Sequence, residues 1–151
     1  MKLQDILTED CTSCAVQISS KKKILEQICA IATNHIPEHS TFELLQSLLE
    51  REKMGSTGIG NGIAIPHGRL TGTKHVVAVL LTSEQPVAFD AIDNRAVDIF
   101  VALFVPEDCC KEHLSTLQSI AKLLSNKQMS KSIRKCTSDK ALFDLINQAA
   151  E

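Results

Sequence analysis

Histidine is the side chain in this sequence best suited to covalent chemistry near neutral pH, and one histidine has distinctive neighbours. His67 lies between Pro66 and Gly68, and Arg69 follows two residues later. The unperturbed pKa of histidine is about 6.5, so a neutral imidazole is available as a nucleophile. One ring nitrogen can attack a phosphorus atom while a hydrogen bond to the other fixes the tautomer. The fixed charge of Arg69 favours a reaction of His67 with an anion.

A glycine-rich stretch surrounds this histidine. Five of the six glycines fall within residues 50–69. Glycine weakens helices and strands, so this concentration is typical of a loop that bends sharply or approaches a ligand closely. Backbone amides of such a loop can donate to the oxygens of a phosphoryl group, as can hydroxyls and guanidinium groups. The side chains of this kind in the stretch are Ser56, Thr57, Arg51 and Arg69.

Two common phosphate-binding motifs do not fit the stretch. A P-loop ends in Gly-Lys followed by Ser or Thr, which is absent here, so nucleotide hydrolysis is not expected. The dinucleotide fingerprint requires G-x-G-x-x-G directly after a strand, whereas Gly58, Gly60 and Gly62 are evenly spaced after a predicted helix. A loop histidine is more often solvated than reactive. A phosphate- or nucleotide-binding module without a covalent step therefore stays an alternative.

Three parts of the chain resemble one known family. They are Arg51–Lys53 with Gly55–Arg69, Phe89–Asn94 with Val97–Pro106, and His113–Leu117. These segments resemble IIA proteins of the bacterial phosphoenolpyruvate-dependent phosphotransferase system, of the fructose and mannitol type, and are most similar to the nitrogen-regulatory IIA proteins. The resemblance covers nearly the whole chain. It implies that residues 1–151 form a single IIA type-2 domain, with a mixed β-sheet flanked by helices.

The resemblance also implies a phosphoryl carrier, a component of a protein phosphotransferase. His67 would accept the group from a histidine phosphocarrier protein of the HPr or NPr type, which Enzyme I charges from phosphoenolpyruvate. His113 would be a second, supporting histidine beside it. No cofactor and no metal is expected. The residues expected to hold the phosphoryl group are Arg51, Ser56, Thr57 and Arg69.

The elements that must position these residues can be read from hydrophobic spacing. Residues 3–7 suggest a short helix and residues 15–18 a strand. Ser20 can cap the next helix. Ser40–Glu43 matches the sequence pattern of a capping box, and the helix that follows is expected to place Arg51 next to the loop. Residues 63–65 form a short extended segment. Pro66 would end its pairing and leave His67 at a strand end.

Later in the chain, two apolar runs at residues 75–82 and 97–105 predict central strands covered on both faces. A turn is expected at residues 70–73. Asp108 can cap a helix that carries His113 beside a core stripe, with short helices expected near residues 129–134 and after Ser138. The core stripe of the long helix is Leu114, Leu117, Ile120, Ala121 and Leu124. Strands and helices around one sheet make the fold class α/β.

Composition narrows the functional classes further. The chain has 151 residues, a net charge of −2 and 44% apolar residues, which argues against nucleic acid as a partner. No apolar run reaches the length of a membrane span, and the first residues have no signal-peptide core, so a cytoplasmic protein without membrane insertion is expected. Cys11 and Cys14 have the spacing of half a zinc or redox site, but no second such pair exists. His35 and His39 are expected to be ordinary surface histidines.

Three functional classes follow. The first is a regulatory carrier whose phosphorylation state controls binding to target proteins. The second is a relay in fructose- or mannitol-type sugar uptake, which would pass the phosphoryl group to a separate IIB protein. The third is the non-covalent binding module. Apolar residues near the loop, such as Met54 and Ile59, are expected at a transient interface with the donor.

Overall fold

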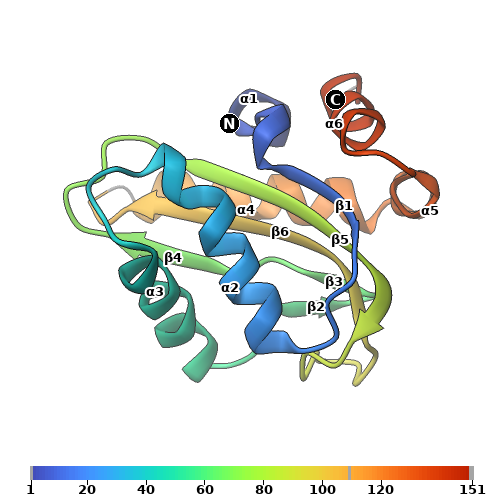
Figure 1. Cartoon of the computed structure of the whole chain (residues 1–151), viewed down its shortest axis with the longest axis horizontal. Helices are drawn as coiled ribbons and strands as arrows, with labels where there is room; N and C mark the ends of the chain where they lie inside the picture. The colour runs from blue at the N-terminus through green and yellow to red at the C-terminus, as the bar shows by residue number, and fades with distance from the viewer. Residues whose placement is uncertain (1, 109, 150–151) are drawn as a thin grey trace.

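One twisted β-sheet lies between helices in the computed structural model, which describes residues 2–108 and 110–149 (Figure 1). Two helices, α2 and α3, cover one face of the sheet, and α4 covers the other. The short helices α1 and α6 lie beside β1 at one edge, close to both termini (Figure 1). The helices are α1 (Leu3–Ile6), α2 (Lys21–Ala32), α3 (Thr41–Lys53), α4 (Cys110–Ser125), α5 (Lys127–Lys135) and α6 (Asp139–Asn147), with 3₁₀ turns η1 (Glu9–Cys11) and η2 (Thr33–His35).

The sheet is mixed, as the resemblance implied. Its strands are β1 (Thr12–Val16), β2 (Gly58–Gly60), β3 (Ile63–Ala64), β4 (His67–Leu70), β5 (Val77–Val87) and β6 (Val97–Pro106). Their order is β1-β5-β6-β3-β2, and β4 also pairs with β6. Strands β5 and β6 are antiparallel neighbours, and β1, β3 and β4 pair in parallel with one of them. Both central strands are buried along most of their length, which explains their nearly continuous apolar sequence.

The segment before and after Pro66 runs along one edge of β6. Residues of β3 pair with Ile99 and Phe100, and β4 resumes the pairing with His67 opposite Leu103. The carbonyl of Pro66 still accepts a hydrogen bond of 3.0 Å from the amide of Leu103. The expectation that pairing ends at Pro66 is therefore wrong. The proline lacks an N–H but keeps its carbonyl, so the ladder is interrupted only briefly and His67 begins a strand.

The predicted helix caps on α2, α3 and α6 are confirmed. Ser20 accepts from the amide of Lys23, and Ser138 accepts from the amide of Ala141. Ser40 and Glu43 form the reciprocal capping box, with bonds of 3.1 Å and 2.8 Å. Asp108 stays a predicted cap for α4, because Cys109, the residue directly before that helix, lies outside the described residues.

Three strand boundaries differ from those expected. The first strand, β1, begins at Thr12 rather than at residue 15 and contains an irregularity at Ala15, whose φ is 53°. The amide of Ala15 donates to the Thr82 hydroxyl instead of continuing the ladder. Leu70 belongs to β4, so the turn starts one residue later than predicted. The fifth strand begins two residues later than predicted and extends to Val87. Polar residues near its end hid this extension from hydrophobic spacing.

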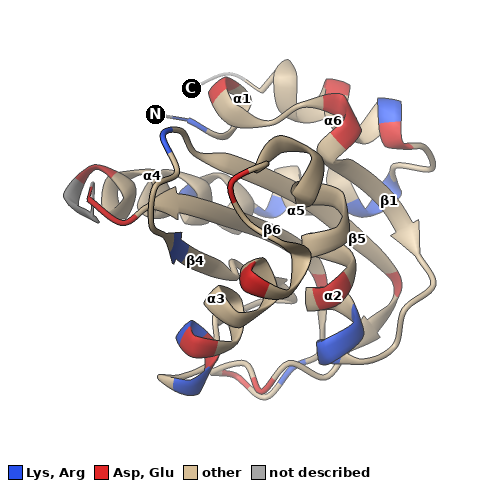
Figure 2. Cartoon of the chain, turned by 60° about the vertical axis from the view of Figure 1, so that its left-hand side comes forward, with Lys and Arg blue, Asp and Glu red and all other residues tan. Residues whose placement is uncertain are grey.

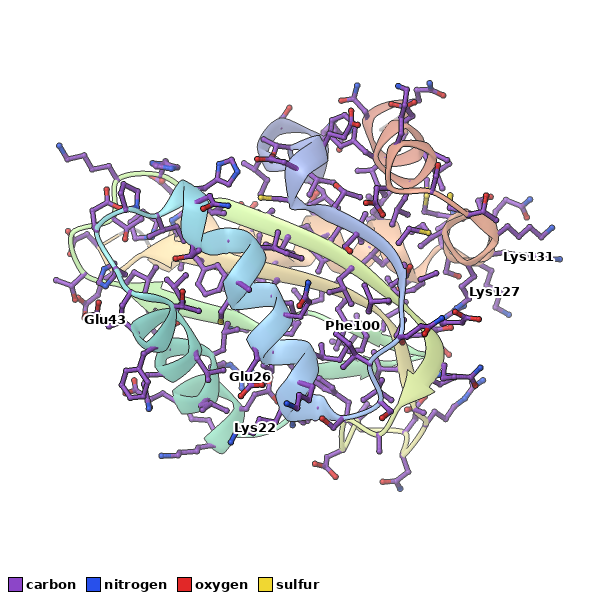
Figure 3. All side chains as sticks on the ribbon, viewed as in Figure 1. Lys22, Glu26, Glu43, Phe100, Lys127 and Lys131 are labelled. Carbon is purple, nitrogen blue, oxygen red and sulfur yellow. The ribbon has the colours of Figure 1, made fainter. Side chains whose placement is uncertain are left out.

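The core lies on both faces of the central strands. Phe100, labelled in Figure 3, is fully buried, and its ring centroid is 5.5 Å from that of Phe89. On α4, Ile120 and Leu124 are buried as expected, whereas Leu114 is 58% exposed and does not belong to the core stripe. Among the described residues, no helix combines the length and apolar character that crossing a membrane requires.

Candidate functional site

Helix α3 approaches β4 so closely that only glycine fits beneath it. A Cβ atom on Gly68 would lie 2.8 Å from Cβ of Ser47, a distance that real side chains do not tolerate. Arg51 follows Ser47 by one helical turn and therefore projects from the same face of α3, next to the start of β4. Gly68 thus brings the guanidinium of Arg51 toward His67. This close approach is the one structural reason for glycine after the histidine.

Arg51 also closes the first bend of the glycine-rich loop. Its Nη1 donates to the carbonyl of Gly55 at 2.8 Å, where φ reaches 140°. The hydroxyl of Ser56 donates to the carbonyl of Phe89 at 2.6 Å and accepts from the amide of Gly58 at 3.0 Å. The Ser56 hydroxyl is therefore engaged in holding the loop. Its direct contact with a phosphoryl group stays a prediction.

Glu52 anchors the middle of the loop from inside the protein. Its carboxylate accepts from the amide of Thr57 at 3.2 Å and also from the Thr57 hydroxyl. The same carboxylate lies 2.9 Å from Nζ of Lys21, and the Glu52 side chain is only 6% exposed. The Lys21 ammonium also lies 4.5 Å from the ring centroid of Phe89. Spacing along the chain does not reveal this cluster, because Lys21 begins a run of three lysines, a pattern typical of a solvated helix face.

The far turn of the loop is held by other segments. Gly60, Asn61 and Gly62 all have positive φ angles, of 100°, 59° and 79°. The amide of Asn61 donates to Asp93 at 3.0 Å, and the carbonyl of Asn61 accepts from Nη2 of Arg134 at 2.8 Å. Charged residues at the end of α3 and the lysines that begin α2 flank the loop in Figure 2. Contacts from several elements therefore fix the loop.

His67 is held in one tautomer by the short segment between β3 and β4. Its Nδ1 lies 3.0 Å from the carbonyl oxygen of Ile65. A carbonyl oxygen has no proton to give, so Nδ1 is the donor and Nε2 of the neutral ring keeps the lone pair. The ring is half-buried. The arrangement is the one that a histidine nucleophile requires, with one nitrogen fixed and the other available.

Burial lowers the pKa of His67 below its usual 6.5. The hydrogen bond to Ile65 opposes this change, the positive charge of Arg51 reinforces it, and the smaller influences are Glu52, which raises the pKa, and Arg69, which lowers it. The neutral, nucleophilic ring is therefore favoured near neutral pH. The charges of Arg51 and Arg69 thus lie within electrostatic reach of His67, and their contact with a phosphoryl group stays a prediction.

His113 occupies the first part of α4 and is 6% exposed, more deeply buried than expected. Neither ring nitrogen has a hydrogen-bond partner among the described residues. Buried polar groups without a partner are uncommon in proteins. None of the hydrogen bonds within the described part of the chain joins His113 to His67, so a supporting role for His113 stays a prediction.

Two histidines expected at the surface are engaged in contacts. Nε2 of His39 lies 2.7 Å from the carbonyl of Thr71, and the side chain is 14% exposed. His35 lies 2.8 Å from a carboxylate oxygen of Asp10. Asp10, Cys11 and His35 form a group whose possible ligand atoms lie within 4.8 Å of one another. Spacing along the chain does not reveal this group, because His35 is distant from residues 10–11.

Three exposed apolar side chains lie in or next to the glycine-rich loop. Met54 is 80% exposed and Ile59 39% exposed, as the predicted docking role requires, and Ile92 is 84% exposed. The amide of Ile92 lies 3.4 Å from the carbonyl of Gly58, which places this residue beside the loop. Exposed apolar side chains that gather at one place are typical of an interaction surface.

Comparison with known proteins gives a consistent answer. Residues 5–149 match the family model described as phosphoenolpyruvate-dependent sugar phosphotransferase system, EIIA 2. A nitrogen regulatory protein of Klebsiella oxytoca is 45% identical over 150 residues, which cover 99% of this chain and 92% of the relative. The nitrogen regulatory protein of Escherichia coli strain K12 is 46% identical over 149 residues, covering 97% and 90%.

Solved structures agree. The nitrogen regulatory protein IIA-Ntr of Neisseria meningitidis superposes with a TM-score of 0.88 at 31% identity, covering 95% of this chain and 98% of that one. The mannitol IIA protein of Escherichia coli shares the fold, with a TM-score of 0.69 at 18% identity and coverage of 95% and 96%. The chain therefore belongs to the EIIA 2 family of the phosphoenolpyruvate-dependent sugar phosphotransferase system.

Proposed function

We propose that this protein is a phosphoryl carrier and that His67 accepts the phosphoryl group from a histidine phosphocarrier protein of the HPr or NPr type. The observation that carries the proposal is the 3.0 Å contact between Nδ1 of His67 and the carbonyl of Ile65. This contact leaves Nε2 as the nucleophile and keeps its lone pair available. Membership of the family supports the carrier role for the chain as a whole, residues 1–151 acting as one IIA domain.

The transfer needs no net movement of a proton. Nε2 of His67 attacks the phosphorus of the donor's phosphohistidine in line, a new N–P bond forms, and the bond to the donor nitrogen breaks. The donor imidazole, protonated at its other nitrogen, leaves as a neutral ring, while Nδ1 of His67 keeps its proton and donates it in the hydrogen bond to the carbonyl of Ile65. The phosphoryl charge moves with the group. The protein must supply position and a positive field rather than acid–base chemistry.

The positive field comes from Arg51 and Arg69, the two cations whose charges act on His67. One N–H group of Arg51 donates to the carbonyl of Gly55. The guanidinium can turn from this carbonyl and offer its remaining N–H groups to the phosphoryl oxygens. His113 is a candidate for a bond to the phosphorylated ring, since both its nitrogens lack partners among the described residues. Met54, Ile59 and Ile92 would contact the incoming donor.

A regulatory carrier in the cytoplasm is the role that we favour. Relatives that match almost the whole chain at 45% and 46% identity bear the name nitrogen regulatory protein. A fructose-specific EIIABC component of Bacillus subtilis matches at 24% identity, over 23% of its length. We therefore expect the phosphorylation state of His67 to control binding to a target protein. Passage of the group to a separate IIB protein is the alternative role.

Phosphorylation in a reconstituted system tests the proposal. The protein is incubated with phosphoenolpyruvate, Enzyme I and the phosphocarrier protein, and its intact mass is measured before and after acid treatment. We expect one acid-labile phosphoryl group on the wild type, none on His67→Ala, and an unchanged group on His75→Ala, whose histidine is exposed and lies outside the loop. An equally phosphorylated His67→Ala protein would disprove the assignment of His67.

A second measurement separates the regulatory role from the transport role. Phosphorylated protein is mixed with purified IIB acceptors of the fructose and mannitol types, and loss of the group is followed by mass. Retention of the phosphoryl group, with both acceptors shown to be active toward their own IIA donors, supports the regulatory carrier. Rapid and complete transfer to one acceptor supports the relay in sugar uptake instead.

A further inference from the structure

A cavity of about 500 Å³ lies between α5, the end of α4 and the far turn of the glycine-rich loop. Its wall includes Asn61 and Ile63 from the loop side and Leu124 from α4. Five of its lining residues have cationic side chains, and the cavity wall contains no acidic residue among those described. These five side chains are Arg95, Lys127, Lys131, Arg134 and Lys135.

This concentration of positive charge contrasts with the rest of the chain. The protein has 16 lysines and arginines, 18 acidic residues and a net charge of −2, yet five of those cations line one cavity. Of these five cations, Arg134 pairs with Asp98 at 3.0 Å and Arg95 interacts electrostatically with Asp93, whereas none of the three lysines has an ion pair among the described residues. Clustered cations that are not neutralised by nearby acids raise the local concentration of anions.

The sequence of α5 places its charges on one side. Lys127 and Lys131 are separated by one helical turn, and Lys135 follows after another. The opposite side of the helix buries Ile133 against the protein, and Ser130, which is also buried, lines the cavity with the lysines. Figure 3 shows Lys127 and Lys131 extending from α5 toward the same side. Packing of the apolar side therefore presents the lysines together at the cavity.

The inner wall of the cavity is apolar. Ile63 is 1% exposed and Leu124 is fully buried, so they form an apolar floor beneath the rim, and the carbon surface open to a ligand comes mainly from the stems of the lysine and arginine side chains. The volume falls in the range of about 300–1,000 Å³ that is usual for small-molecule sites. A ligand that fits must combine a group of low polarity with strongly anionic groups. Organic phosphates have this composition.

The rim is attached to the loop that carries His67. Arg134 donates from Nε to both carboxylate oxygens of Asp98 at 3.0 Å and from Nη2 to the carbonyl of Asn61 at 2.8 Å. A Cβ atom on Gly62 would lie 2.6 Å from Nη2 of Arg134, so the arginine is packed tightly on the turn. These contacts fix one cation of the rim in place. The others remain on long side chains that can close on a ligand.

We propose that this cavity binds an organic polyphosphate, with its phosphates on the cations of α5 and Arg95 and its organic group against the carbon stems of these side chains, above Ile63 and Leu124. The site is separate from His67 and does not depend on the phosphoryl carrier role. A concave wall favours a small ligand over a nucleic acid, which would need a continuous basic surface along its backbone. Binding of this kind is non-covalent and changes no bond in the ligand.

Equilibrium binding of ATP, tripolyphosphate and adenosine tests the proposal, measured by calorimetry and by amide chemical shifts of the whole protein. The cavity variant carries Lys127→Glu and Lys131→Glu. The matched control carries Lys22→Glu and Lys23→Glu, two exposed lysines at the start of α2. His67→Ala serves to separate this site from the proposed phosphoryl site. Far-ultraviolet circular dichroism shows whether each variant is folded.

We expect saturable binding of ATP, with shifts concentrated in α5 and at residues 61–63. Reversal of the two lysine charges should weaken this binding roughly tenfold. The control and His67→Ala should bind as the wild type does, and ATP should bind more tightly than tripolyphosphate because of its organic group. An unaffected cavity variant, or loss of binding in His67→Ala, would overturn the proposal. RNA binding that ATP does not displace would likewise overturn it, in favour of a nucleic-acid surface.

Discussion

Replacement of Glu52 by glutamine should destabilise the protein and disturb the loop that carries the proposed phosphoryl site. The Glu52 carboxylate accepts from both the amide and the hydroxyl of Thr57 and pairs with Lys21 at 2.9 Å. Glutamine has nearly the same shape, but only its carbonyl oxygen can accept. Its amide N–H groups would face either the Thr57 donors or the Lys21 ammonium, so at least one donor loses its partner.

The size of the stability loss in Glu52→Gln follows from the burial of the two charged side chains. A hydrogen bond to a charged group contributes about 1.5–3 kcal/mol, and removal of one partner from a buried ion pair costs about 3–5 kcal/mol. The Glu52 side chain is 6% exposed but that of Lys21 is 25% exposed, so water can replace part of the lost interaction of Lys21. Since glutamine also keeps one bond to Thr57, we expect a loss of about 2–3 kcal/mol in the free energy of unfolding.

Urea unfolding followed by circular dichroism measures this loss. The control is Glu50→Gln, which removes the same charge from an exposed position on the same helix, and it should change the stability by less than about 0.5 kcal/mol. A double variant with Lys21→Met and Glu52→Gln should regain about 1 kcal/mol, since the unpaired ammonium is then gone. Equal stabilities of Glu52→Gln and Glu50→Gln would refute the argument that Glu52 anchors the loop.

Three further predictions concern separate parts of the structure. Since burial lowers the pKa of His67 below 6.5, its ring should titrate below that pH in nuclear magnetic resonance, and a midpoint at or above 6.5 would contradict this. The unfolded chain binds the proton more readily than the folded protein does, so His67 lowers the free energy of unfolding as the pH falls through and below 6.5. Gly68→Ala should cost about 1–3 kcal/mol in urea unfolding, because its methyl group would meet Ser47 on α3; unchanged stability would show that α3 can move away freely. Ser138→Ala should cost about 1 kcal/mol, because the amide of Ala141 loses its cap, and a change within measurement error would mean that α6 does not depend on it.

Much of the fold could be predicted because local signals agreed with the tertiary structure. The serines that cap α2, α3 and α6 lie directly before apolar helical patterns, and each accepts the expected amide. The apolar runs of β5 and β6 are buried on both faces. Boundaries were less predictable where a distant residue decides them. The irregularity at Ala15 depends on the hydroxyl of Thr82, which is far away in the sequence.

The candidate site was predictable to the extent that it is local. His67, Arg51 and Arg69 lie within one short stretch, and the structure brings their charges together. The environment of the hydroxyls was not predictable, because Ser56 and Thr57 bond to Phe89 and Glu52 rather than facing outward. Short polar side chains in a glycine-rich loop satisfy the nearest unpaired backbone groups first. Their availability to a ligand therefore depends on tertiary contacts that spacing alone does not reveal.

The contacts of the loop also explain how a segment rich in glycine can present a histidine in one orientation. Glycine loses the most conformational freedom on ordering, so a free loop of this composition would meet a large entropic cost when it binds a partner. Here contacts from separate segments order the loop during folding, before any partner binds. Glu52 and Arg51 hold the loop from α3, Asp93 holds its far turn, and Arg134 holds the same turn from α5. The order of the proposed phosphoryl site is thus built into the folded state, and residues outside the glycine-rich motif control it.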